Sequence, residues 1–271
     1  MVAIWALMLY FLHSEVYAPY LSSLFPASTA FILQIVISFI SCGIFMTAFV
    51  YFLFKKEAKT NFRSFYKIER LDVKGIWLAV VLSIIIQIIN VAFLYKALLE
   101  PCRDFLISMG LYGGKIGLGS VEIVPLLSPS EAVFLTVFLT LFWWVEIPEE
   151  LFFRGYVQNK TQDIIGKNFA MVLSAFLWDI AHLFGLVNFV ERFIYGLVYG
   201  FIFRVRQNTT PTMLIHPVGN RALLLAVIIP QIWGVTLQGA SQWLLLSLLY
   251  ITMLLSVIIG WKILQLDKKA I

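Results

Sequence analysis

The amino-acid sequence predicts an all-α polytopic membrane protein. Of its residues, 61% are hydrophobic and 13% charged, and the mean hydropathy is +0.91. In soluble globular domains, by contrast, about a quarter of the residues are charged. Several apolar runs approach or exceed the roughly 20 residues that a helix needs to cross the hydrocarbon core. Lys and Arg also concentrate in alternate connections between these runs, as expected of a chain that crosses a membrane repeatedly.

About eight transmembrane helices are predicted. The candidate spans are 2–12, 28–54, 75–98, 131–157, 168–187, 191–205, 211–229 and 241–262. The first is interpreted as a short span, because it has neither a basic leading segment nor a small-residue cleavage site of a signal peptide. No soluble domain or internal repeat is visible, so residues 1–271 are expected to form a single integral-membrane domain. Cys42 and Cys102 suggest neither a disulfide framework nor a zinc cluster.

The basic residues predict the orientation. Connection 55–74 is rich in Lys and Arg, which marks it as cytoplasmic. Alternation then places both termini in the cytoplasm, while 13–27 and 230–240, predicted outside, contain no Lys or Arg. This distribution explains the net charge of +5 without a nucleic-acid partner. The apolar residues interleaved in 55–74 could also form an amphipathic helix on the cytoplasmic leaflet.

The stretch "EIPEELFFRG" at 146–155 follows a long uncharged run. One interpretation is that the span ends at Val145 and the acids are solvated. The other is a functional role, because an ionised side chain near the bilayer centre costs about 2.5–3.5 kcal/mol and is rarely placed there without one. Two histidines in apolar segments, His182 and His216, favour the second interpretation. His13 is expected at a span boundary or in a loop.

Helical spacing sorts these polar residues. Glu150 and Arg154 are four apart and are expected to pair, which leaves Glu149, about 100° around the helix, to point elsewhere. Three further pairs have the same spacing: Trp178 and His182, His216 and Asn220, and Gly196 and Gly200. The glycine pair would allow a neighbouring helix to approach closely.

The position of each residue along its helix tests whether these polar side chains can meet. Glu149 lies 17 residues before Gly166, the expected turn, and His182 lies 16 after it. On antiparallel helices both reach roughly 24–26 Å from that turn, so the two side chains can meet. His216 lies only about 11 Å beyond the "RQNTTP" turn. Either that turn dips into the protein or the helices tilt.

Three ordered motifs, "EELFFR", "WDIAH" and "HPVGN", resemble those of the type II CAAX prenyl endopeptidases, within the broader CPBP/Abi group of intramembrane proteases. The resemblance covers about 70 residues, and the motif core runs from about 146 to 220. The usual aromatic residue of the second motif is Phe. Trp178 stands at that position here, and either ring is expected to pack beside the histidine.

The resemblance implies an endopeptidase that cleaves after the prenylated cysteine of a C-terminal CAAX sequence and releases a tripeptide. Its partners would be a prenylated CAAX protein or peptide and the lipid bilayer. The implied cavity is formed by spans four to seven and opens to the cytoplasm and the bilayer. The implied catalytic residues are Glu149 as the base, His182 as its partner on the water, and His216 and Asn220 as oxyanion donors. Glu150 and Arg154 would act as scaffold or contact the substrate carboxylate, and Trp178 would support them.

Other mechanisms and functions are compatible with the sequence. Two histidines and a glutamate could bind catalytic zinc, with Glu146 or Glu150 then as the base. There is no HExxH motif, so a metal-free reaction without a cofactor is expected. The alternatives to a protease are an Abi-type immunity or scaffold protein and a proton-coupled transporter. In the transporter, the buried acid and histidines would form a proton relay, although no inverted halves are visible.

Overall fold

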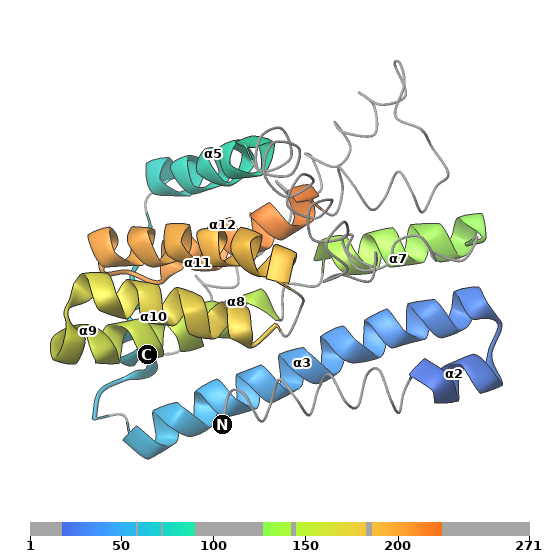
Figure 1. Cartoon of the computed structure of the whole chain (residues 1–271), viewed down its shortest axis with the longest axis horizontal. Coiled ribbons are helices and arrows are strands. Elements are labelled where there is room, and N and C mark those ends of the chain that lie inside the picture. Colours follow the sequence, from blue (N-terminus) through green and yellow to red (C-terminus); the bar gives the residue numbers. More distant parts are fainter. Residues whose placement is uncertain are drawn as a thin grey trace, which may run out of the picture.

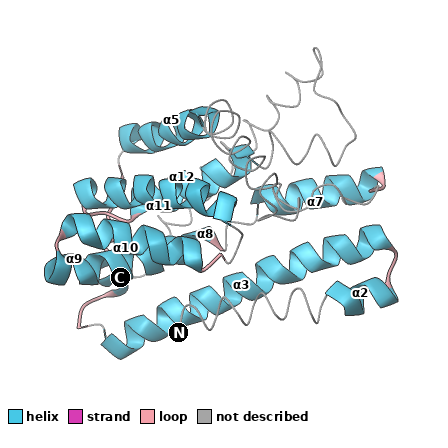
Figure 2. Ribbon diagram, in the orientation of Figure 1, coloured by secondary structure: helices cyan, strands magenta, loops and turns pink. Residues whose placement is uncertain are grey.

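The computed structural model describes residues 18–57, 59–71, 73–89, 127–141, 145–182 and 186–223, and these contain helices and loops but no strand (Figures 1 and 2). The elements are α2 (Ala18–Leu24), α3 (Ala27–Glu57), α4 (Phe62–Phe65), α5 (Val73–Ile89), α7 (Pro129–Leu141), α8 (Glu146–Glu150), η4 (Leu151–Gln158), α9 (Asn159–Ile165), α10 (Lys167–Ile180), α11 (Leu186–Arg206) and α12 (Thr210–Leu223). The predicted spans 2–12 and 241–262, together with His13 and Cys102, lie outside the described residues. The all-helical prediction is confirmed for the described part of the chain.

Helix α3 matches the predicted second span. It runs from Ala27 to Glu57 and ends in two lysines. Among the described residues it is the one helix that is long and apolar enough to cross a membrane, while Val73–Ser83 and Pro129–Leu139 are shorter apolar helices. The helices at the other predicted spans do not pass this test, so the arrangement of eight spans stays a prediction.

The predicted fourth span, 131–157, was wrong as a single element. Helix α7 ends at Leu141, and a new helix begins at Glu146 and continues through α8, η4 and α9 to Ile165. Pro148 lies in the first turn of this second helix, where a proline is tolerated, whereas it would disrupt the interior of one continuous helix. The η4 segment is a π-helix of eight residues, a form often found at functional sites.

Gly166 forms the turn between α9 and α10. Its φ of 81° and ψ of 154° lie in a region that a residue with a side chain rarely adopts. The turn sends α10 back along η4, and α10 also packs against α11. The helical hairpin predicted around Gly166 is therefore present.

Helix α11 approaches α10 and η4 closely at two glycines. A Cβ at Gly196 would lie 2.9 Å from the Cβ of Ala175. The carbonyls of the two glycines also accept hydrogen bonds from η4: Arg154 Nη2 donates to Gly196 at 3.1 Å and Gln158 Nε2 donates to Gly200 at 2.8 Å. Small residues therefore serve both the packing and the polar contacts of this interface.

Segment 59–71 packs against the turn between α11 and α12. The Thr209 N–H donates to the Lys67 carbonyl at 2.8 Å, and the Thr210 hydroxyl donates to the Glu69 carbonyl at 2.6 Å. This turn is covered by protein, and Thr209 is fully buried. This burial agrees with one of the two explanations for the position of His216, a turn that dips into the protein, while a tilt of the helices stays a prediction.

The amphipathic surface helix considered for 55–74 is not formed. Only Phe62–Phe65 is helical within its central part, and Phe65, Tyr66 and Leu71 are buried in the protein core. The Tyr66 hydroxyl also donates to the Val50 carbonyl of α3. The apolar side chains of this connection therefore pack against the protein's own helices.

The main core joins helices from both halves of the described chain. It includes Met46, Val50, Leu53, Phe65, Tyr66, Leu71, Ala79, Val80, Leu151, Phe152, Phe153, Trp178, Tyr195, Tyr199, Met213, Leu214, Ile215 and Val218. Helix α12 packs on α5 and α8, and the Ser83 hydroxyl donates to the Ile215 carbonyl at 2.9 Å. These contacts fix α12 against the helix that begins at Glu146.

We expect Gly196→Ala to lower the melting temperature of the protein in detergent. The added methyl group would overlap Ala175, and overpacking of this kind costs about 1–3 kcal/mol. Ala175→Gly should compensate in part, since it removes the overlapping atom. The measurement is a double-mutant cycle of melting temperatures, in which strictly additive losses would contradict the close approach of α10 and α11.

Candidate functional site

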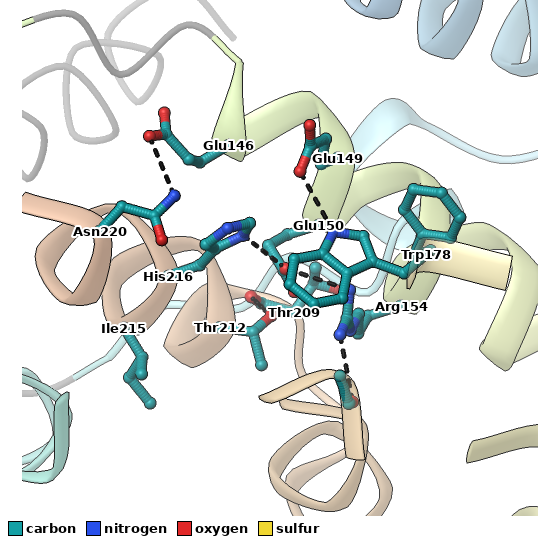
Figure 3. A network of polar contacts seen from close by, with 12 residues as sticks. Glu146, Glu149, Glu150, Arg154, Trp178, Thr209, Thr212, Ile215, His216 and Asn220 are labelled. Atoms are coloured by element: carbon teal, nitrogen blue, oxygen red, sulfur yellow. Dashed lines mark hydrogen bonds and ion pairs between the residues drawn. The ribbon is translucent and has the colours of Figure 1, made fainter. Parts of the chain in front are cut away.

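The three acids of the "EIPEE" stretch are buried. Glu146, Glu149 and Glu150 have exposed fractions of 3%, 5% and 0%. The interpretation that they are solvated beyond the end of a span was therefore wrong. Each acid contacts a different set of side chains, and together these contacts join α8 to η4, α10 and α12 (Figure 3).

Glu150 is held by two basic side chains. Its Oε1 lies 3.2 Å from Arg154 Nη1 and 2.9 Å from His216 Nδ1. Glu150 and Arg154 are completely buried, and the predicted i,i+4 pair is confirmed. An ionised carboxylate in this position is stable only with such partners, because its desolvation costs several kcal/mol.

Aromatic rings complete the surroundings of this ion pair. The Arg154 guanidinium carbon lies 5.2 Å from the centre of the Trp178 ring and 5.5 Å from that of Tyr199. The His216 ring contacts the same two aromatic residues, with centroid distances of 5.4 Å and 5.2 Å. Cation–π contacts of this kind favour a guanidinium that has been removed from water.

Glu149 points away from Arg154, as its helical position predicted. Its Oε2 accepts a hydrogen bond from Trp178 Nε1 at 3.1 Å and lies 3.9 Å from His182 Nε2. The register of the hairpin at Gly166 therefore brings Glu149 and His182 together. The Trp178 ring packs beside His182, with centroids 4.8 Å apart, as expected for the aromatic residue of the second motif.

The tautomer of His182 follows from its backbone contact. Its Nδ1 lies 2.7 Å from the Trp178 carbonyl oxygen, which can only accept, so Nδ1 carries the proton. In the neutral ring, Nε2 is then an acceptor directed at Glu149 Oε2. The 3.9 Å between these two atoms is too long for a hydrogen bond, but one water can donate to both. The His182 side chain is 25% exposed, which gives this position access to water.

His216 and Asn220 lie on one face of α12 but contact different acids. His216 reaches Glu150, while Asn220 Nδ2 donates to Glu146 Oε1 at 3.4 Å, a long hydrogen bond. His216 is buried and Asn220 is exposed. The structure thus brings both residues to the acids of α8, without the two converging on one protein atom (Figure 3).

Two ion pairs, the first buried and the second part-buried, were not predicted from the sequence. Arg221 pairs with Glu146, and Arg192 Nε donates to Asp179 Oδ1 at 3.0 Å. The sequence does indicate that Arg221 has a partner, because it follows Asn220 directly in an apolar segment, where a charge needs to be paired. Glu146 had been considered only as a base for a zinc mechanism.

The candidate zinc ligands lie on α8, just after α10 and on α12. Glu149 and His182 lie near each other, while His216 Nδ1 contacts Glu150, so only the other ring nitrogen of His216 could bind a metal. Within the part of the chain that the structure describes, no group of three or more His, Cys, Asp or Glu side chains is arranged to hold a metal ion. The metal-free reaction expected from the sequence stays a prediction.

The model of the family described as "Type II CAAX prenyl endopeptidase Rce1-like" matches residues 131–222. These residues are therefore similar to that family, and they are called the Rce1-like region. The resemblance inferred from the three motifs is thereby confirmed. No curated protein and no solved structure matches the chain.

The Rce1-like region contains all the predicted site residues, from Glu149 on α8 to Asn220 on α12. The family indicates a membrane-embedded protease. The match covers about a third of the chain and leaves the role of each residue open. Those roles depend on the geometry described above.

We expect Arg154→Ala to destabilise the protein far more than Glu149→Ala. Loss of the guanidinium leaves Glu150 buried beside a single basic partner, and breaking a buried pair costs about 3–5 kcal/mol. Arg206→Ala, which removes an exposed arginine of α11, is the matched control. Melting temperatures in detergent test this assignment. Equal losses of melting temperature in the Arg154 and Glu149 variants would contradict this assignment, because it gives a structural role to Arg154 and none to Glu149.

Proposed function

We propose that the protein is an intramembrane endopeptidase that hydrolyses the peptide bond after a prenylated cysteine in a C-terminal CAAX sequence and releases the tripeptide. The observation that carries the proposal is the pair of acceptors, Glu149 Oε2 and His182 Nε2, held 3.9 Å apart within the Rce1-like region. This separation suits a single water that donates to both atoms.

The proposed reaction begins with that water. Its two O–H groups point at Glu149 and His182, so an oxygen lone pair is directed at the substrate carbonyl carbon. As the new C–O bond forms, one of the two bases takes a water proton and the carbonyl electrons move to the oxygen. The intermediate then collapses, the C–N bond breaks, and the released amine of the tripeptide takes up a proton from the same base.

His216 and Asn220 are proposed to stabilise the oxyanion. His216 Nδ1 donates to Glu150, so its Nε2 can also donate only when the ring carries both protons. Asn220 is exposed, and its contact with Glu146 is long at 3.4 Å, so the amide can turn toward a substrate at little cost.

Burial favours one of the two roles considered for Arg154. Its side chain has no exposed surface, and its guanidinium lies against Glu150, the Gly196 carbonyl and two aromatic rings. A substrate carboxylate could reach it only if this network opened. The scaffold role is therefore the one that the geometry supports.

The same proposal places the chain in a membrane as a single domain with both termini in the cytoplasm. Helix α3 supports it, because large apolar side chains such as Ile44 and Tyr51 remain exposed on it and suit contact with lipid. The catalytic cavity, formed by predicted spans four to seven, would open to the cytoplasm and the bilayer. A prenylated protein or peptide could then approach with its lipid in the bilayer.

We expect the purified protein to release the tripeptide from a farnesylated CAAX peptide, as identified by mass spectrometry. Glu149→Gln should abolish release without lowering the melting temperature, because it removes the base and keeps the shape of the side chain. Glu69→Gln, at an exposed carboxylate, is the control. Activity should also survive a metal chelator.

The outcomes of this assay separate the alternatives. A folded protein that releases no tripeptide would contradict the peptidase and favour a scaffold. Activity that is lost with the chelator and restored by zinc would overturn the metal-free mechanism.

We expect Asn220→Ala to reduce kcat by about 10²–10³ with KM little changed, which is the usual effect of losing one oxyanion donor. Steady-state kinetics and melting temperature on this variant distinguish the possible roles. A raised KM would indicate ground-state binding. A lowered melting temperature with kcat intact would indicate that Asn220 serves only as an interhelical hydrogen bond to Glu146.

A further inference from the structure

We propose that Trp178 is a positioning residue that holds Glu149 and His182 in register, through its indole N–H on one side and its main-chain carbonyl on the other. This inference rests on the proposed function. It concerns a residue that differs from the phenylalanine usual at this position.

The two contacts of Trp178 reach both sides of the proposed water position. Nε1 donates to Glu149 Oε2 at 3.1 Å, and the carbonyl oxygen accepts from His182 Nδ1 at 2.7 Å. The first contact fixes the carboxylate oxygen that faces the histidine. The second fixes the tautomer that turns Nε2 toward that oxygen.

Indole suits this task because its nitrogen is a donor only. It satisfies one lone pair of Glu149 Oε2 and leaves the other for a water. Having no lone pair to offer, it cannot compete for that water's proton. A phenyl ring could fill much of the same space, but it would leave the carboxylate without this donor.

The orientation of the indole is itself fixed by packing. Trp178 is 4% exposed, and the Arg154 guanidinium lies 5.2 Å from its ring centre. Helix α11 also packs closely on the indole, since a Cβ at Gly196 would lie only 3.2 Å from Trp178 Cε3. The indole N–H is thus held toward Glu149 before any substrate binds, as preorganisation of a catalytic group requires.

Kinetics on two replacements of Trp178 test the proposal. Trp178→Phe removes the N–H and reduces the ring, whereas replacement with 3-benzothienylalanine removes the N–H and keeps the bicyclic shape. Both should lower kcat about tenfold or more, the scale of one hydrogen bond to a charged group, with KM nearly unchanged. Trp77→Phe, at an exposed tryptophan of α5, should leave both constants unchanged.

A wild-type kcat in the benzothienyl protein would overturn the proposal, because ring volume and not the donor would then matter. A rise in KM alone would also overturn it, since that result indicates contact with the substrate.

A spectroscopic measurement tests the contact independently of activity. The indole N–H hydrogen-bond marker band of Trp178, isolated as the ultraviolet resonance Raman difference between wild type and Trp178→Phe, should shift toward a weaker hydrogen bond in Glu149→Ala. An unshifted band would overturn the proposal whatever the kinetics show. If the band shifts but the wild-type protein releases no tripeptide, the peptidase proposal fails and the positioning of Glu149 by Trp178 is still supported.

Discussion

The buried carboxylate of Glu150 is the constraint on which the described structure depends. An ionised group without solvent exposure must be compensated, and Glu150 receives Arg154 from its own helix and His216 from α12. The second contact ties together residues 66 positions apart in the sequence. It thereby brings α12, and with it Asn220, against the helix that carries Glu149.

The ion pair of Glu150 with Arg154 also constrains the residues that surround it. Arg154 has hydrogen-bonding capacity beyond one carboxylate, and the Gly196 carbonyl takes part of it at 3.1 Å. That contact needs the main chain of α11 close to η4, and glycine allows the approach. The guanidinium also lies over the Trp178 and Tyr199 rings. The charge pair, the glycines and the aromatic rings therefore form one packing unit.

Helical geometry explains which features could be predicted from the sequence. The Glu150–Arg154 pair and the meeting of Glu149 with His182 depend on spacing along helices and one turn at Gly166, and both are present. The break in the predicted span 131–157 and the docking of Lys67 on Thr209 were not predicted. They depend on tertiary contacts between distant segments, for which a single sequence carries no periodic signal.

The three neighbouring acids of α8 have different partners, and these partners determine how readily each carboxylate could take up a proton. Glu150 lies against a guanidinium and an imidazole, and Glu146 pairs with Arg221. Among the described residues, the contacts of Glu149 are instead a neutral indole N–H and the acceptor nitrogen of His182. A carboxylate locked to a guanidinium is a poor base, since protonation would break the ion pair. Glu149 has no such bond to lose, and for this reason the proposed mechanism uses it, and not Glu146 or Glu150, as the base.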